Sequence, residues 1–203
     1  MGSSTRSTPA APAEPLGERA LVALARALTP LAAALLCVPA VRRRLRARAL
    51  AAWSAEQAPL VVCYGNINRS PFAAELLRAR TGRPVRSTGL YRAPGRPSPA
   101  ASVACARALG VDLSGHRSSV LELRGAERGQ ALFVFDLENV ARIAWRWPPA
   151  LRRVRLLGAL AEDGELIVPD PHGRGREALE QAFARIAEIV EELSGVVGGQ
   201  APR

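Results

Sequence analysis

The sequence contains no lysine, few aromatic residues, three cysteines and two histidines. All 28 basic residues are therefore arginine, and the formal net charge is +10. Aromatic residues make up 4% of a chain that is 48% hydrophobic, so its core must consist largely of aliphatic side chains. Three cysteines without metal-type spacing argue against both a disulfide framework and a zinc site. Free thiols of this kind indicate a reducing, cytoplasmic setting.

The positive charge is concentrated at the front of the chain. Residues 1–58 carry eight Arg against three Glu. Such a balance suits nucleic acid, anionic lipid or a phosphorylated partner. No motif typical of nucleic-acid binding accompanies it, and we therefore expect no nucleic-acid partner.

Composition divides the chain into four parts. Residues 1–17 are rich in Ser, Thr, Pro and Ala and are predicted to be a disordered tail. Residues 18–57 form an Ala/Leu-rich, basic helical extension, residues 58–197 a catalytic domain, and residues 198–203 a short tail. No candidate site residue lies in residues 1–57. Their deletion is accordingly expected to leave a folded, active domain.

The extension has three interpretations. The uninterrupted apolar stretch at 27–41 would span about 22 Å as a helix, short of the roughly 30 Å hydrocarbon core of a bilayer. A membrane span therefore requires Arg26 to snorkel. A basic helix over residues 20–50 that lies peripherally on anionic lipid is an equal contender. The third is a helix, or two short ones, packed on the catalytic domain or on a second copy of the chain.

After residue 58 short apolar runs alternate with helical patterns. The spacing predicts a three-layer α/β fold, in which helices cover both faces of a four-stranded parallel sheet and the helical extension is added at the N-terminus. Ligands of such sheets bind beyond the carboxyl ends of the strands. Strands are predicted at 60–63, 84–87, 131–135 and 154–157, and helices at 71–81, 98–109, 137–145 and 176–193.

The first predicted strand ends in Cys63, and Arg69 follows at the start of a helix that opens with Ser70 and Pro71. Five intervening residues can curl their backbone amides around one anion, at which the helix N-terminus also points. Arg69 adds a planar, two-pronged donor that matches two phosphate oxygens. The same donors stabilise a thiolate, so the pKa of Cys63 is expected to be lowered.

The full string CYGNINRSP at 63–71 resembles the phosphate loop of the bacterial-type low-molecular-weight protein tyrosine phosphatases, Cys-x-Gly-Asn-x-x-Arg-Ser-Pro. The resemblance covers roughly residues 59–195 and implies that family's fold. It also implies hydrolysis of phosphotyrosine in proteins through a phosphocysteine on Cys63, with no cofactor and no metal. The residues that it assigns to phosphate binding and loop support are Tyr64, Gly65, Asn66, Ile67, Asn68, Ser70 and Ser87, beside the catalytic Cys63 and Arg69.

The segment VPDPHG at 168–173 is similar to the family's mobile Asp-Pro-aromatic loop. By that resemblance Asp170 is the general acid that protonates the leaving phenol and later the base for water. Three positions depart from the family: Asn68 stands where many members have a second Cys, Ser119 where a basic residue is common, and His172 where Tyr is usual. None of them removes a catalytic atom.

Two other functions share these features. Thioredoxin-coupled arsenate reductases have the same fold and anion loop but need two more thiols near the third strand, where this chain has none. A non-catalytic phosphoprotein-binding domain would not need Cys63, Arg69 and Asp170 together. The resemblance implies a phosphotyrosine-containing protein as partner, and bacterial relatives point to an autophosphorylating tyrosine kinase.

Overall fold

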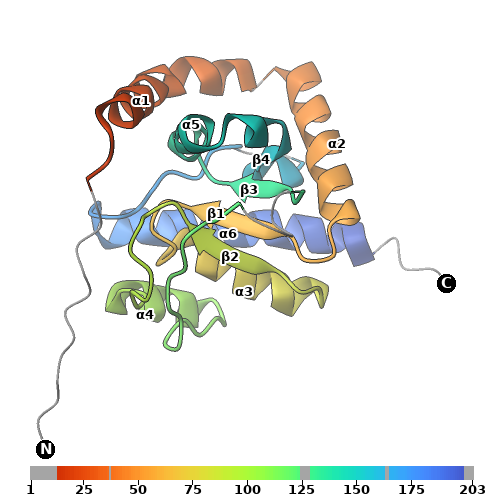
Figure 1. The fold of residues 1–203 in the computed structure, drawn as a ribbon. Helices are drawn as coiled ribbons and strands as arrows, with labels where there is room; N and C mark the ends of the chain where they lie inside the picture. The colour runs from red at the N-terminus through yellow and green to blue at the C-terminus, as the bar shows by residue number, and fades with distance from the viewer. Residues whose placement is uncertain (1–12, 37, 124–128, 163–164, 199–203) are drawn as a thin grey trace, which may run out of the picture.

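The computed structural model describes residues 13–36, 38–123, 129–162 and 165–198. Its centre is a parallel sheet of four strands in the order β2-β1-β3-β4 (Figure 1). Leu60 at the start of β1 pairs with Arg86 of β2 and Leu132 of β3, which makes β1 a central strand. The strands are β1 (Leu60–Cys63), β2 (Arg86–Gly89), β3 (Leu132–Val134) and β4 (Val154–Leu156).

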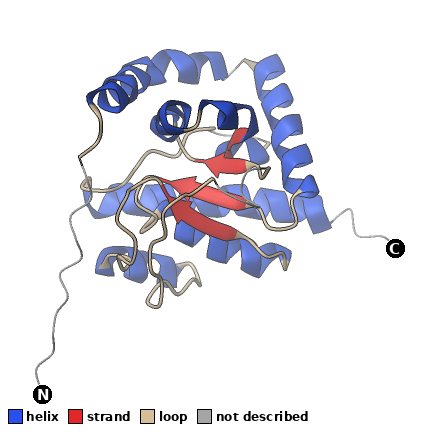
Figure 2. Ribbon diagram, viewed as in Figure 1, coloured by secondary structure: helices blue, strands red, loops and turns tan. Residues whose placement is uncertain are grey.

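Helices cover both faces of this sheet (Figure 2), which confirms the predicted fold class. Along β1, Val61 packs in the same apolar cluster as Phe72 and Ile186, whereas Leu60 packs in a second cluster with Ile143. Alternate side chains of the strand therefore point to opposite faces of the sheet and pack in two separate apolar cores. Helices α3 (Arg69–Thr81), α4 (Ala100–Ala108) and α6 (Gly175–Gly198) cover one face, and α5 (Leu137–Arg146) covers the other. Two 3-10 helices, η2 (Pro148–Arg153) and η3 (Leu157–Leu160), come directly before and after β4.

The element boundaries differ slightly from the sequence prediction. Helix α3 begins at Arg69 rather than at residue 71, so the loop that precedes it is shorter by two residues. Strand β2 lies two residues further along the chain than predicted, because the ladder with β1 runs from Arg86 to Gly89.

The extension is a pair of helices, α1 (Leu16–Leu36) and α2 (Pro39–Ala55). Helix α1 lies across α5 as an outer layer, and α2 runs beside the β4 edge of the sheet (Figure 1). Helix α1 begins inside the segment predicted to be disordered, and residues 1–12 of that segment lie outside the described residues. The two helices therefore pack on the catalytic domain, as the third of the interpretations above predicts.

Buried ion pairs attach α1 to α5. Glu18 is fully buried and lies 2.5 Å from Arg146 Nη2 and 3.4 Å from Arg142 Nη1. Near the middle of α1, Arg26 Nε lies 2.8 Å from Glu138 Oε1. A carboxylate buried at Glu18 without these partners would be strongly unfavourable, so α1 is docked in one position.

Helix α2 contributes to the main core through Trp53, which is 0% exposed. Its ring meets Phe133 edge-on, with centroids 5.9 Å apart, and Arg83 stacks on it at 5.0 Å. Residues 1–57 thus contain a core residue of the domain itself. This burial revises the expectation that the domain folds without them.

Candidate active site

The loop between β1 and α3 curls around the sulfur of Cys63. Asn66 has a positive φ of 50°, which turns its backbone amide toward Sγ at 3.1 Å. Asn tolerates this left-handed conformation better than most residues. The loop and the start of α3 therefore form an amide-lined cradle at the carboxyl end of a central strand.

Side chains behind the loop hold this shape. The Asn66 side-chain amide donates to Ser70 Oγ at 2.9 Å and to Ser87 Oγ at 3.1 Å, and its oxygen accepts from the Ser119 amide at 2.8 Å. Ser70 Oγ lies 3.0 Å from Cys63 Sγ. A Cβ at Gly89 would lie 2.8 Å from the Asn66 Cβ, so glycine is required where β2 passes the loop.

Arg69 is buried beside the cradle. Its Nη1 donates to Asp136 Oδ2 at 2.5 Å and to the Val168 carbonyl at 2.8 Å, while Nη2 forms an ion pair with Asp170 Oδ2 at 2.9 Å. Burial by itself lowers the pKa of Arg69, but the two carboxylates raise it above its usual value. Its Nε is buried and makes no hydrogen bond to any residue that the structure describes, and Nη2 has the Asp170 ion pair but no hydrogen bond among these residues. A bound oxyanion would satisfy these donors.

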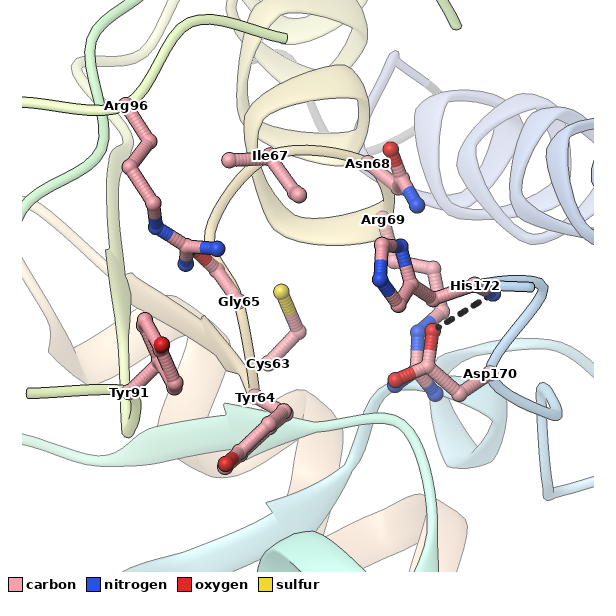
Figure 3. A pocket seen from close by; sticks show the side chains of 10 residues that line it. All are labelled: Cys63, Tyr64, Gly65, Ile67, Asn68, Arg69, Tyr91, Arg96, Asp170 and His172. Carbon is pink, nitrogen blue, oxygen red and sulfur yellow. Dashed lines mark hydrogen bonds and ion pairs between the residues drawn. The ribbon is translucent and has the colours of Figure 1, made fainter. Parts of the chain in front are cut away.

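Asp170 sits on the loop that precedes α6 and faces the cradle (Figure 3). The Val168 amide donates to the Phe135 carbonyl at 2.8 Å, which anchors the loop to the end of β3. The His172 amide donates to Asp170 Oδ1 at 3.2 Å. The Asp170 side chain remains 37% exposed, so it lies between Arg69 and solvent.

A cavity of about 160 Å³ opens over the sulfur (Figure 3). Tyr64 and Tyr91 form one wall, with ring centroids 5.5 Å apart in an edge-on arrangement. Arg96 stacks on Tyr91 at 4.1 Å and donates to the Gly65 carbonyl at 2.6 Å. The cavity therefore combines aromatic walls with a cationic rim.

The expected lowering of the Cys63 pKa is wrong for this arrangement. Burial of the sulfur raises the pKa of Cys63 above its usual value and outweighs the lowering effects of Arg69 and the Ser70 hydroxyl, while Asp170 raises it further. The charge of Arg69 is already balanced by Asp136 and Asp170, so less of it acts on the sulfur. The shift in the pKa therefore favours the thiol of Cys63 over the thiolate.

The N-terminal extension reaches this site. Arg142 of α5 stacks on the Tyr64 ring at 4.1 Å and forms an ion pair with Glu14. Burial and a hydrogen bond to Glu14 raise the pKa of Tyr64 to about 12. Sequence reasoning missed this link, because nothing near Glu14 marks it as a partner of residues far along the chain.

The structure brings the predicted residues together in two shells. Those that line the cavity are Cys63, Tyr64, Gly65, Ile67, Asn68, Arg69 and Asp170. Asn66, Ser70 and Ser87 lie behind the loop as hydrogen-bonded supports. Sequence reasoning missed Asp136, Tyr91 and Arg96 as site residues; the position of Asp136 at the end of a strand was the one available signal. In the described part of the chain, no group of three or more His, Cys, Asp or Glu side chains could hold a metal ion.

Comparison with known proteins agrees with this geometry. The chain is 31% identical over 134 residues to the low molecular weight protein-tyrosine-phosphatase Etp of Escherichia coli K12. This match covers 66% of this chain and 89% of Etp. It is 30% identical over 142 residues to the low molecular weight protein-tyrosine-phosphatase Wzb of Salmonella typhi, and this match covers 70% of this chain and 94% of Wzb.

Solved structures share the fold at lower identity. Wzb from Escherichia coli K30 with sulphate superposes with a TM-score of 0.62 and 24% identity, over 70% of this chain and 99% of Wzb. The YwlE arginine phosphatase from Geobacillus stearothermophilus gives a TM-score of 0.62 and 24% identity, over 71% and 95%. The sequence model described as "Low molecular weight phosphotyrosine protein phosphatase" matches residues 59–201. The chain therefore belongs to the low molecular weight phosphotyrosine protein phosphatase family.

Proposed function

We propose that the protein hydrolyses phosphotyrosine in proteins through a phosphocysteine on Cys63. The observation that carries this proposal is the set of donors around the sulfur. Arg69 lines the cavity and its buried Nε makes no hydrogen bond among the described residues, while the Asn66 amide donates to Cys63 Sγ. Together they form a site for a tetrahedral oxyanion in contact with a nucleophile.

The chemistry would proceed in two displacements. The thiol of Cys63 gives its proton to Asp170 and the thiolate attacks phosphorus. The bond from phosphorus to the phenol oxygen breaks, and Asp170 passes the proton to that oxygen. Water then attacks the phosphocysteine, Asp170 takes the proton from water, and the thiolate of Cys63 leaves. Arg69 and the loop amides stabilise the charge of the phosphoryl group in both steps.

The cavity walls favour an aromatic ester over other phosphorylated side chains. YwlE, which shares the fold, is an arginine phosphatase, so the fold alone does not choose the substrate. Here Tyr64, Tyr91 and Ile67 line the cavity and offer aromatic and aliphatic surface to a phenyl ring. The guanidinium of Arg96 on the rim would repel the guanidinium of a phosphoarginine.

The two alternative functions fit less well. Arsenate reduction of the thioredoxin-coupled type needs a relay of thiols, and Cys105 on α4 does not line the cavity. Among the described residues, Cys105 is the one free cysteine besides Cys63. A domain that only bound phosphoproteins would have no use for Asp170 beside Arg69.

Replacing Asp170 with Ala tests the acid role. We expect turnover of phosphate esters with poor leaving groups, such as phenyl phosphate, to fall by roughly 10²- to 10⁴-fold, the usual size of general-acid catalysis. The loss should shrink for a very acidic phenol, because its phenolate departs without a proton. Steady-state rates over a series of aryl phosphates measure this dependence. Equal losses across the series would show that Asp170 is not the acid.

The partner that we propose is a cytoplasmic, autophosphorylated tyrosine kinase, reached from the membrane surface through residues 20–50. The outer face of α1 supports lipid contact: Leu24, Leu28, Leu31 and Leu35 follow helical spacing and are 46–70% exposed. By length and mean hydropathy, 1.6 over its most apolar window, α1 could also span a bilayer. Its other face, however, carries the buried Glu18 ion pairs, so peripheral contact preserves the fold and a span would not.

Vesicle flotation tests this contact without deleting a core element. The full chain is expected to float with vesicles that contain phosphatidylserine and to stay behind with pure phosphatidylcholine. A variant with Leu28→Asp and Leu31→Asp should lose flotation while its phosphatase activity is kept, because both side chains are exposed on α1. Failure of the full chain to float with anionic vesicles would rule out the proposed contact.

A further inference from the structure

A groove of about 650 Å³ runs between α1 and the loop that carries Asp170. Its volume lies within the range of about 300–1,000 Å³ that is typical of ligand sites. Arg26, Thr29 and Pro30 of α1 form one side, and Pro169 and Arg174 lie on the other. Helix α5, which lies beneath α1 in Figure 1, contributes the floor through Leu137, Glu138, Asn139 and Arg142.

This groove is continuous with the catalytic cavity. Tyr64, Asp170 and His172 line both, so the groove begins where the cavity ends. In Figure 3 Asp170 and His172 form the side of the cavity opposite Tyr91. A polypeptide whose phosphotyrosine occupies the cavity would therefore pass directly into the groove.

The α1 side of the groove is particular to this chain's N-terminal extension. Arg26, Thr29 and Pro30 precede residue 59, where the match to the family begins. Two hydrogen bonds at 2.8 and 2.9 Å join the Arg26 guanidinium to the Glu138 carboxylate across the floor. The α1 side of the groove is thus held in place before any substrate binds, and this lowers the entropic cost of binding.

One charged side chain of the groove lacks an ion-pair partner among the described residues. Each carboxylate that lines it has an arginine partner: Asp136 and Asp170 pair with Arg69, and Glu138 pairs with Arg26. Arg174 is exposed, and no described residue forms an ion pair with it. Its charge is therefore available to an acidic side chain of a bound peptide.

We propose that this groove binds the polypeptide that flanks the phosphotyrosine, with Arg174 selecting an acidic residue close to it. The proposal rests on the phosphatase function proposed above. It makes the N-terminal extension part of the substrate-binding surface. The enzyme then recognises a phosphotyrosine in an acidic stretch of protein, and not the phosphorylated ring alone.

The test compares a peptide with a substrate too small to reach the groove. The substrates are phenyl phosphate and two phosphotyrosyl peptides of equal length, one with Glu and one with Ala on both sides of the phosphotyrosine. Thr29→Trp fills the groove, since Thr29 lines it. Leu31→Trp is the matched control, because Leu31 is 70% exposed on the same helix and does not line the groove. All measurements use the full chain.

The ratio of kcat/KM for the Glu peptide to kcat/KM for phenyl phosphate is expected to fall by about tenfold in Thr29→Trp. Most of the fall should come from a higher KM for the peptide. Leu31→Trp should leave that ratio unchanged. The wild-type preference for the Glu peptide over the Ala peptide, about threefold for one exposed charge pair, should disappear in Arg174→Ala. Should Thr29→Trp not fold, Arg174→Ala decides alone, because it changes an exposed side chain.

The two proposals fail in different ways. If the wild-type protein turns over phenyl phosphate but Thr29→Trp leaves the peptide ratio unchanged, or the wild type shows no preference for the Glu peptide, the groove proposal is overturned and the phosphatase function stands. If the wild-type protein does not hydrolyse phenyl phosphate at all, the phosphatase function fails, and the groove proposal that rests on it fails too.

Discussion

Replacing Cys63 with Ser is expected to abolish hydrolysis of aryl phosphates. The serine hydroxyl would occupy the position of Sγ, 3.1 Å from the Asn66 amide, but it is a far weaker nucleophile than a thiolate. We expect kcat to fall by at least about 10⁴-fold, the scale of losing the nucleophile in covalent catalysis. Steady-state turnover of phenyl phosphate measures the loss.

Two controls separate this loss from misfolding. Cys63→Ser should unfold at the same temperature as the wild type, because the substitution keeps the shape of a buried side chain. It should also still bind inorganic phosphate, since Arg69 and the loop amides are unchanged. Turnover within tenfold of wild type would mean that Cys63 is not the nucleophile.

Replacing Trp53 with Ala is expected to destabilise the protein by about 3–5 kcal/mol, the usual cost of removing a buried aromatic ring. Trp53 is fully buried, and it packs against Phe133 of β3 and beneath the Arg83 guanidinium. Unfolding in urea, followed by circular dichroism, gives the free energy of unfolding. Deletion of residues 1–57 removes this ring together with the partners of Arg142 and Arg146, and is expected to prevent folding.

The matched control for Trp53 is Leu31→Ala. Leu31 also lies in the N-terminal extension, but it is 70% exposed, so its removal should change the free energy of unfolding by less than about 0.5 kcal/mol. A soluble, cooperatively folding protein that lacks residues 1–57 would show that α2 is an accessory of the domain and not part of its core.

The fold class was predictable because its signals are local. Each strand is a short apolar run and each helix has its own pattern, and only a parallel sheet accommodates their alternation. The phosphate loop was predictable for the same reason: Cys63, Asn66, Arg69 and Ser70 are close in sequence, and the loop's hydrogen bonds join neighbours.

The burial of the extension was not predictable, because a helical apolar pattern does not say what covers it. Glu18 is held by Arg142 and Arg146, which lie more than 120 residues further along the chain. The direction of the Cys63 pKa shift was beyond the sequence for a related reason. It depends on the burial of the sulfur and on Asp170, which comes from a loop about 100 residues further along the chain.

Trapping the phosphoenzyme tests the central claim most directly. Asp170→Ala, which is expected to slow hydrolysis of the intermediate, is mixed with an aryl phosphate of a very acidic phenol, quenched in acid within milliseconds and digested for mass spectrometry. We expect one added phosphoryl group on the peptide that contains Cys63, and none when Cys63→Ser is combined with Asp170→Ala. A phosphoryl group on any other residue, or turnover by Asp170→Ala with Cys63 unmodified at every time point, would contradict it.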